Sequence, residues 1–185
     1  MKAHYSDSIL EYDGTQLRSH FAYESYNICG DSIVAFQGRA NVCIEHMVDK
    51  EDVIANAPIF SENMLHFIVE HFTDNFNWAI ACQRLLISCI REDLQDCLEY
   101  HPFTRRGDDI YDENAKLTVS IATRSPVSCL IHTGINISSK NTPVLTKGLE
   151  DYKLIPQSFA TSVMNRYIAE IRGMQKARAK VRGVA

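Results

Sequence analysis

Apolar and polar residues alternate in the middle of the chain, and this pattern predicts strands. In the run that starts at Lys116, successive side chains switch between apolar and polar, as in a strand with one buried face. The apolar positions expected on that face are Leu117, Val119 and Ile121. After a break at residues 124–126, a second strand is predicted. We therefore expect strands 116–122 and 127–137 to pair as neighbours.

Apolar residues spaced three and four apart predict the longest helix, over about residues 76–98 with Asp74 as its N-cap. Gln83 and Arg84 lie just outside the apolar stripe, which we interpret as core. The stripe consists of Trp78, Cys82, Leu85, Leu86, Cys89, Ile90, Leu94 and Cys97. A final amphipathic helix is predicted after Pro156. Its apolar side consists of Phe159, Val163, Met164, Tyr167, Ile168 and Ile171.

Two apolar runs predict further strands, over residues 32–36 and 64–72. The first strand is expected to end at the Gln-Gly-Arg sequence of residues 37–39. In the second, alternation places His66 and Glu70 on one face, whereas the other histidine faces away. A zinc pair needs both histidines on one side, so a zinc site is not expected here.

Strands that interleave with helices without a regular βαβ rhythm predict an α+β fold. We expect a mixed or largely antiparallel sheet backed by two long helices. A length of 185 residues is typical of one domain, so residues 1–185 are expected to form a single domain.

The composition, with 45% hydrophobic and 23% charged residues, is that of a globular protein. No apolar run reaches the roughly 18 residues of a membrane span, and the first residues do not resemble a secretory signal. The six cysteines are scattered and are interpreted as free thiols. We therefore expect a cytoplasmic protein that does not bind membranes.

The charge is unevenly distributed along the chain. The net charge of −4 gives no reason to expect nucleic-acid binding, except through residues 172–182, which carry five cations and no acid. Cations at the end of the final helix match the helix dipole, and they would also serve to dock an acidic partner. The sequence is compatible with a homo-oligomer.

Candidate chemistry lies around the predicted pair of strands. Asp108 and Asp109 precede the first strand, Lys116 begins it, and Gly134 lies inside the second, where a ligand or backbone often comes close. A cation that faces two carboxylates suits an anionic small molecule, with or without Mg²⁺. A solvated turn and a protective lysine at a sheet edge are the alternatives. Cys129 is not expected to pair with the histidine three positions later, because they face opposite ways on a strand.

The order Asp108-Asp109-Ile110, Lys116-Leu117 and Gly134-Ile135-Asn136-Ile137 resembles the core of the biotin- and lipoate-ligase superfamily, which includes octanoyltransferases. The resemblance implies a class II synthetase-like core and an acyl or nucleotidyl-linked reaction that uses ATP and Mg²⁺. It implies that Lys116 contacts the acyl carboxylate and the α-phosphate, and that Asp109 holds the metal. Asp108 is the second expected catalytic residue. The expected substrate-binding residues are His66, Glu70, Arg106, His132, Gly134 and Asn136.

Almost the whole chain also resembles domain-of-unknown-function family 366, to which no activity is attached. The likeness lies in residues 31–36, 45–49, 64–72, 83–86 and 106–109.

One segment departs from the ligase pattern. Lipoate ligases have an arginine- and glycine-rich loop that wraps the adenylate, whereas residues 46–63 of this chain contain no glycine. Two functions therefore remain open. The chain binds a small carboxylate- or phosphate-bearing molecule, as a ligase or transferase would, or it is a non-catalytic module that docks a partner through its basic C-terminal helix.

Overall fold

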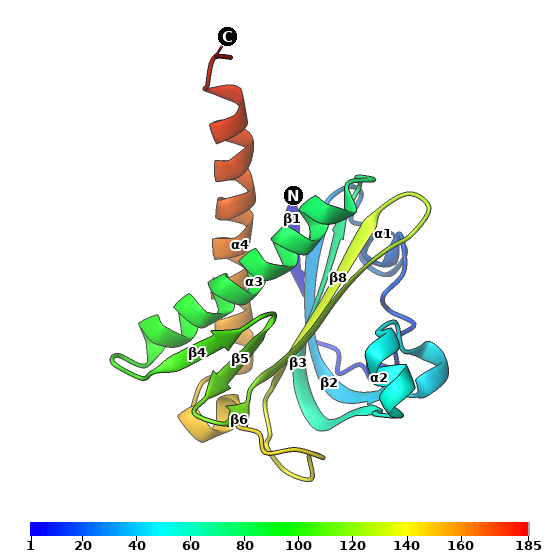
Figure 1. The fold of residues 1–185 in the computed structure, drawn as a ribbon, viewed down its shortest axis with the longest axis vertical. Helices are drawn as coiled ribbons and strands as arrows, with labels where there is room; N and C mark the ends of the chain where they lie inside the picture. Colours follow the sequence, from blue (N-terminus) through cyan, green and yellow to red (C-terminus); the bar gives the residue numbers. More distant parts are fainter. Residues whose placement is uncertain (185) are drawn as a thin grey trace.

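A computed structural model describes residues 1–184, and its main feature is a five-stranded sheet in the order β1-β2-β3-β8-β7 (Figure 1). These strands are β1 (Lys2–Tyr5), β2 (Ser32–Val42), β3 (Ile59–His71), β7 (Thr118–Arg124) and β8 (Cys129–Asn136). β1 runs parallel to β2, and every other pair is antiparallel. The sheet is therefore mixed, as predicted, and β7 and β8 pair as neighbours.

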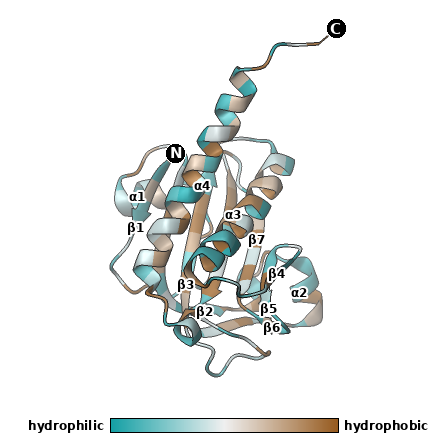
Figure 2. Cartoon of the chain, turned by 90° about the vertical axis from the view of Figure 1, so that its left-hand side faces the viewer, coloured by the Kyte–Doolittle hydropathy of each residue, from teal (hydrophilic) through white to brown (hydrophobic). Residues whose placement is uncertain are grey.

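The two long helices, α3 (Phe76–Cys97) and α4 (Pro156–Ala179), pack on one face of the sheet (Figure 2). The larger hydrophobic core lies between them and the strands. The shorter helices are α1 (Phe21–Tyr26), η1 (Ile44–His46), α2 (Lys50–Ala55) and η2 (Leu149–Tyr152). α1 and the chain before it cover part of the opposite face, with a smaller core of their own. Within residues 1–184, no helix has the combination of length and apolar character that crossing a membrane requires.

Cys97 of the expected core stripe is exposed, and helix α3 otherwise confirms the predicted span but not two further details. Its N-cap is Asn75, not Asp74, because the Asn75 side chain accepts a hydrogen bond from the backbone N of Trp78 at 3.0 Å. Gln83 was placed outside the core, yet it is buried. Its amide bonds to polar groups that the tertiary fold brings to the helix, which helical periodicity cannot predict.

The last helix was predicted to start after Pro156. Helix α4 instead begins at Pro156 itself, because proline is tolerated in the first turn of a helix. All six apolar residues predicted for its inner side are buried. From residue 172 onward, the described side chains are exposed, and this last part extends beyond the sheet (Figures 1 and 2). The basic residues 172–182 therefore lie on a projection of the molecule.

Strand β2 does not end at residues 37–39. It continues to Val42 through an irregularity between Gly38 and Ala40. The N-terminal segment crosses the strand here, and a Cβ on Gly38 would lie 1.8 Å from the carbonyl oxygen of Leu10. Glycine is therefore required for this crossing, which leads to the bridge between Tyr12 and Ala40. β3 likewise begins five residues earlier than predicted, at Ile59.

A second sheet, of three short strands, was not predicted. It consists of β4 (Phe103–Arg106), β5 (Asp109–Asp112) and β6 (Ala115–Lys116) in that order. Strands of two to four residues are too short for an alternating pattern to be recognised. The turn at Gly107 and Asp108 joins β4 to β5, and Gly107 has a φ of +65°.

The inner face predicted for β7 was wrong in part. Leu117 is buried in the core beneath the helices, but Val119 and Ile121 point to the other face of the sheet. Ser120 faces the helices, where its Oγ receives a hydrogen bond from Gln83 at 3.0 Å. Both faces of β7 are partly covered, so apolar character alone does not identify the side that packs against the helices.

The packing of α3 generates the first prediction. Leu86 is fully buried in the large core, so Leu86→Ala should lower the free energy of unfolding by about 2–5 kcal/mol through lost contacts and a cavity. Asn77→Ala, at an exposed position of the same helix, should change it by less than about 0.5 kcal/mol. Urea titration measures both, and equal losses would show that the buried face is misassigned.

The crossing at Gly38 generates the second prediction. In Gly38→Ala the new methyl group meets the Leu10 backbone, which should cost about 1–3 kcal/mol and displace the segment that carries Tyr12. Gly173→Ala is the matched control, because a Cβ there meets nothing within 4 Å and alanine favours the helix. Thermal unfolding compares the variants. Equal stability of Gly38→Ala and wild type would contradict the crossing.

Candidate functional site

A cleft of about 700 Å³ opens beside β7, on the sheet face opposite α3 and α4. Its floor is formed by β3, β8 and β7, and its sides by residues 46–60 and 141–146. The volume lies in the range of small-molecule sites. Much of the wall is apolar, formed by Ile59, Phe60, Met64, Val119, Ile121 and Val144. The cleft can therefore hold the apolar body of a small molecule.

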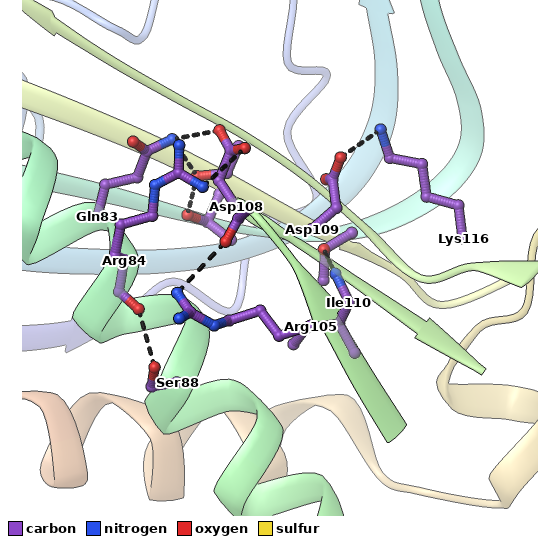
Figure 3. Close-up of polar contacts among 12 residues, drawn as sticks. Gln83, Arg84, Ser88, Arg105, Asp108, Asp109, Ile110 and Lys116 are labelled. Carbon is purple, nitrogen blue, oxygen red and sulfur yellow. Dashed lines mark hydrogen bonds and ion pairs between the residues drawn. The ribbon is translucent and has the colours of Figure 1, made fainter. Parts of the chain in front are cut away.

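Lys116 and Asp109 form an ion pair at the cleft (Figure 3), with 2.8 Å between Nζ and Oδ2. The lysine side chain is only 30% exposed, and among residues 1–184 no other lysine or arginine lines the cleft. Burial raises the pKa of Asp109 and outweighs the opposing effect of Lys116. The second oxygen, Oδ1, is buried and accepts no hydrogen bond from the described residues.

Asp108 turns away from Asp109 toward helix α3 (Figure 3). Its carboxylate accepts a hydrogen bond from the Gln83 amide at 2.9 Å and pairs with Arg84 at 3.2 Å. Gln83 also donates to Ser120, so it connects the turn, the helix and β7. The two adjacent carboxylates therefore have separate cationic partners and do not form one site.

Helix α2 and the residue before it add two more carboxylates to the cleft, Asp49 and Asp52. Asp49 caps the helix and accepts a hydrogen bond from the backbone N of Glu51 at 2.8 Å. Burial and the neighbouring Asp49 raise the pKa of Asp52, and Lys116 opposes them. The cleft thus presents four carboxylates (Asp49, Asp52, Asp108 and Asp109) and one lysine.

Without a cation between them, the carboxylates of the cleft oppose the binding of ATP phosphates. In residues 1–184, no three side chains of His, Cys, Asp or Glu are grouped closely enough to hold a metal ion. Asp109, the expected metal ligand, already neutralises Lys116. The segment that corresponds to the adenylate-wrapping loop of lipoate ligases forms η1 and α2 without a glycine, and its carboxylates repel phosphates.

Aromatic rings close the cleft at the β8 side. The ring of Tyr12 stacks on His132, with centroids 3.8 Å apart and planes 13° from parallel. Nδ1 of His66 lies 3.1 Å from Nε2 of His132. Both histidines are buried, and His132 reaches the cleft while His66 lies behind it. Burial also raises the pKa of the Tyr12 hydroxyl, so it stays protonated.

The predicted pair His66 and Glu70 shares a face of β3, as expected, but not a site. Four residues along a strand separate them by roughly 13 Å. Glu70 accepts hydrogen bonds from the backbone N of His20, at 2.9 Å, and from Ser128 Oγ, at 2.6 Å, so it holds the start of α1 and lies outside the cleft lining. The period-two pattern predicts that two residues share a face of a strand, but not that they lie close together along the strand.

Three further predicted site residues differ in their roles. Asn136 lines the cleft and accepts a hydrogen bond from Ser61 Oγ at 3.1 Å. Gly134 makes room for a side chain rather than for a ligand, because a Cβ there would lie 2.3 Å from Sδ of Met64. Arg106 is outside the cleft lining, and its guanidinium lies over the Tyr111 ring, 4.7 Å from the centroid. It lies on β4, none of whose residues lines the cleft.

Sequence reasoning missed Tyr12, Asp49 and Asp52 as cleft residues. Tyr12 lies outside every predicted strand and helix, and the two acids lie in the glycine-free segment, which was considered only for its lack of glycine. No spacing between these residues and Lys116 signals their proximity. They come together because β2, α2 and β6 meet at the cleft.

Comparison with known proteins supports the fold. An uncharacterised protein of Methanocaldococcus jannaschii is 38% identical over 149 residues, which cover 77% of this chain and, at 66%, slightly less than two thirds of the relative. A solved protein of unknown function from Pyrococcus horikoshi is 37% identical, covers 100% and 99% of the two chains, and has a TM-score of 0.93.

The fold is also that of biotin and lipoate ligase catalytic domains, as the sequence resemblance implied. A biotin protein ligase from Aquifex aeolicus, solved with biotin and ATP, is 14% identical and has a TM-score of 0.67 over 95% of this chain and 72% of that one. At this identity the likeness concerns the fold alone. The family model for domains of unknown function named DUF366 matches residues 1–182. The chain therefore belongs to the DUF366 family, an uncharacterised family with a ligase-like α+β fold.

Proposed function

We propose that this protein binds a small molecule with a carboxylate on an apolar body, and that Lys116 is the group that binds the carboxylate. The observation that carries the proposal is the placement of a single, largely buried lysine at an apolar cleft. An ammonium has three N–H donors, and Asp109 uses one of them. Two donors therefore remain for a ligand.

The shape and wall of the cleft support the proposal that the ligand has an apolar body. The apolar residues of β3 and β7 offer a surface for an acyl chain, and their burial against a ligand would be favourable. Biotin, which is bound in the Aquifex aeolicus ligase of the same fold, is itself a carboxylate on a largely apolar body. An acyl carboxylate is therefore the ligand class that best suits this cleft.

The proposed activity is binding without ATP-dependent ligation. Four carboxylates around one lysine give the cleft a net negative charge, which opposes a triphosphate far more than a single carboxylate. The ion pairs of Asp108 with Arg84 and of Asp109 with Lys116 reduce this charge locally. One small anion beside Lys116 is therefore compatible with the site, whereas several phosphates are not.

A second candidate function rests on a separate observation, the exposed basic end of α4. Residues 172–182 carry five cations and no acid, and they project from the sheet. An isolated helix of this length is marginal in water, and contact with an acidic partner would stabilise it. We propose that this projection docks an acidic partner surface, either in addition to ligand binding or instead of it.

The third prediction tests the cleft. Lys116→Met keeps most of the side-chain bulk and removes the charge. It should weaken binding of octanoate, lipoate or biotin by about 1.5–3 kcal/mol, which is roughly 10- to 150-fold in Kd. Lys140→Met, an exposed lysine outside the cleft lining, is the control. Calorimetric titration without ATP measures both, and unchanged Kd values for Lys116→Met would favour the docking function.

The fourth prediction tests the docking surface. Replacing the five cations of residues 172–182 with glutamine should lower the salt concentration at which the protein elutes from immobilised heparin, which stands for an acidic surface. A control variant neutralises five scattered, exposed cations: Lys2, Lys50, Arg105, Lys140 and Lys153. Both variants have the same net charge, so equal elution would reject a specific role for α4.

A further inference from the structure

The buried pair of His66 on β3 and His132 on β8 has no part in the proposed function. Nδ1 of His66 lies 3.1 Å from Nε2 of His132, and Nε2 of His66 lies 3.2 Å from the carbonyl oxygen of Gly38. Burial lowers the pKa of His66 to about 3 and that of His132 well below its usual range. Both rings are therefore neutral near pH 7, and each carries one N–H proton.

The Gly38 carbonyl decides which nitrogen of each ring carries the proton. A carbonyl oxygen can only accept a hydrogen bond, so Nε2 of His66 must donate and Nδ1 of His66 must be unprotonated. Nδ1 of His66 then accepts, and Nε2 of His132 must donate to it. Nδ1 of His132 is consequently left without a proton, as a hydrogen-bond acceptor.

The surroundings hold His132 in this orientation. The residue is 2% exposed, and its ring stacks on Tyr12 at the cleft. Turning the ring over would break the hydrogen bond to His66. Within residues 1–184 no group donates a hydrogen bond to Nδ1 of His132, and the protein does not fully enclose this nitrogen, so it is accessible from the cleft. A ligand in the cleft could supply the missing donor.

We propose that Nδ1 of His132 is a specificity-determining acceptor that selects ligands with an O–H or N–H group at the end remote from the carboxylate. The proposal depends on the proposed function in one respect only, that Lys116 binds the carboxylate of the ligand. His132 pairs with Ile121 of β7, and Lys116 of β6 precedes Ile121 by five residues, so the backbones of Lys116 and Ile121 are at most roughly 16 Å apart at about 3.3 Å per residue. The ligand that meets both side chains is therefore an elongated acid with a terminal hydroxyl or amide.

The assigned protonation can be measured without any ligand. In protein labelled with ¹⁵N-histidine, long-range ¹H–¹⁵N spectra at pH 7 report which ring nitrogen carries the proton. Spectra of His66→Phe and His132→Phe identify the two rings. We expect both to carry the proton on Nε2 in the wild type, and His132 to populate both forms in His66→Phe. A wild-type His132 with its proton on Nδ1 would overturn the proposal.

The selection of ligands is tested with two acids that differ in one group, octanoate and 8-hydroxyoctanoate. The wild type should bind the hydroxy acid about tenfold more tightly, as expected for one added hydrogen bond to an acceptor that has no protein donor. His132→Phe keeps a ring that can stack on Tyr12 but has no acceptor, so this preference should disappear. The same ratio of affinities in both proteins would contradict the role of His132.

A third measurement separates this inference from the proposed function. If neither acid binds, the carboxylate site fails, and titration with pentanamide, which has N–H donors and no carboxylate, decides the role of His132. Hydrogen bonding to Nδ1 should shift its ¹⁵N resonance in the wild type in proportion to the amide bound. A resonance that does not move at saturating pentanamide would overturn the inference.

Discussion

The packing of α3 and α4 against one face of the sheet is the constraint on which the rest of the structure depends. Burial of Leu86, Phe159, Tyr167 and their neighbours removes that face from water, and hydrophobic burial is the dominant favourable term in folding. Only the opposite face is then available for a ligand. α1 and the N-terminal segment cover the part over β2 and β3, so the cleft opens over β3, β8 and β7.

Charge pairing determines the character of that cleft. A buried charge is costly without a partner, and Lys116 and Asp108 each have one, in Asp109 and Arg84. Asp108 and Asp109 are adjacent in sequence, but each forms an ion pair with a different cation. Together with Asp49 and Asp52 they leave a negatively charged cleft. The ligase-like fold is therefore combined with electrostatics that suit a single carboxylate better than a nucleotide.

Much of the fold was predictable because it depends on local periodicity. The spans of α3 and α4, and the pairing of β7 with β8, agree with the alternation and the helical spacing of apolar residues. The errors lie where the periodic pattern is short or interrupted. β4, β5 and β6 are too short to show a period, and the irregularity at Gly38 was taken for the end of a strand. The site was predicted only around Lys116, Asp108, Asp109, His132 and Asn136.

The sequence by itself determined the α+β class, the apolar faces of the two long helices and the nearness of Lys116 to Asp109, since these depend on residues near one another in the chain. Only the tertiary structure decided that Glu70 and Arg106 lie outside the cleft and that Tyr12 and Asp52 lie inside it. It also decided that the Gly38 carbonyl orients His66 and, through it, His132. These three residues are far apart in sequence and meet only across β2, β3 and β8, so no local pattern records their contact.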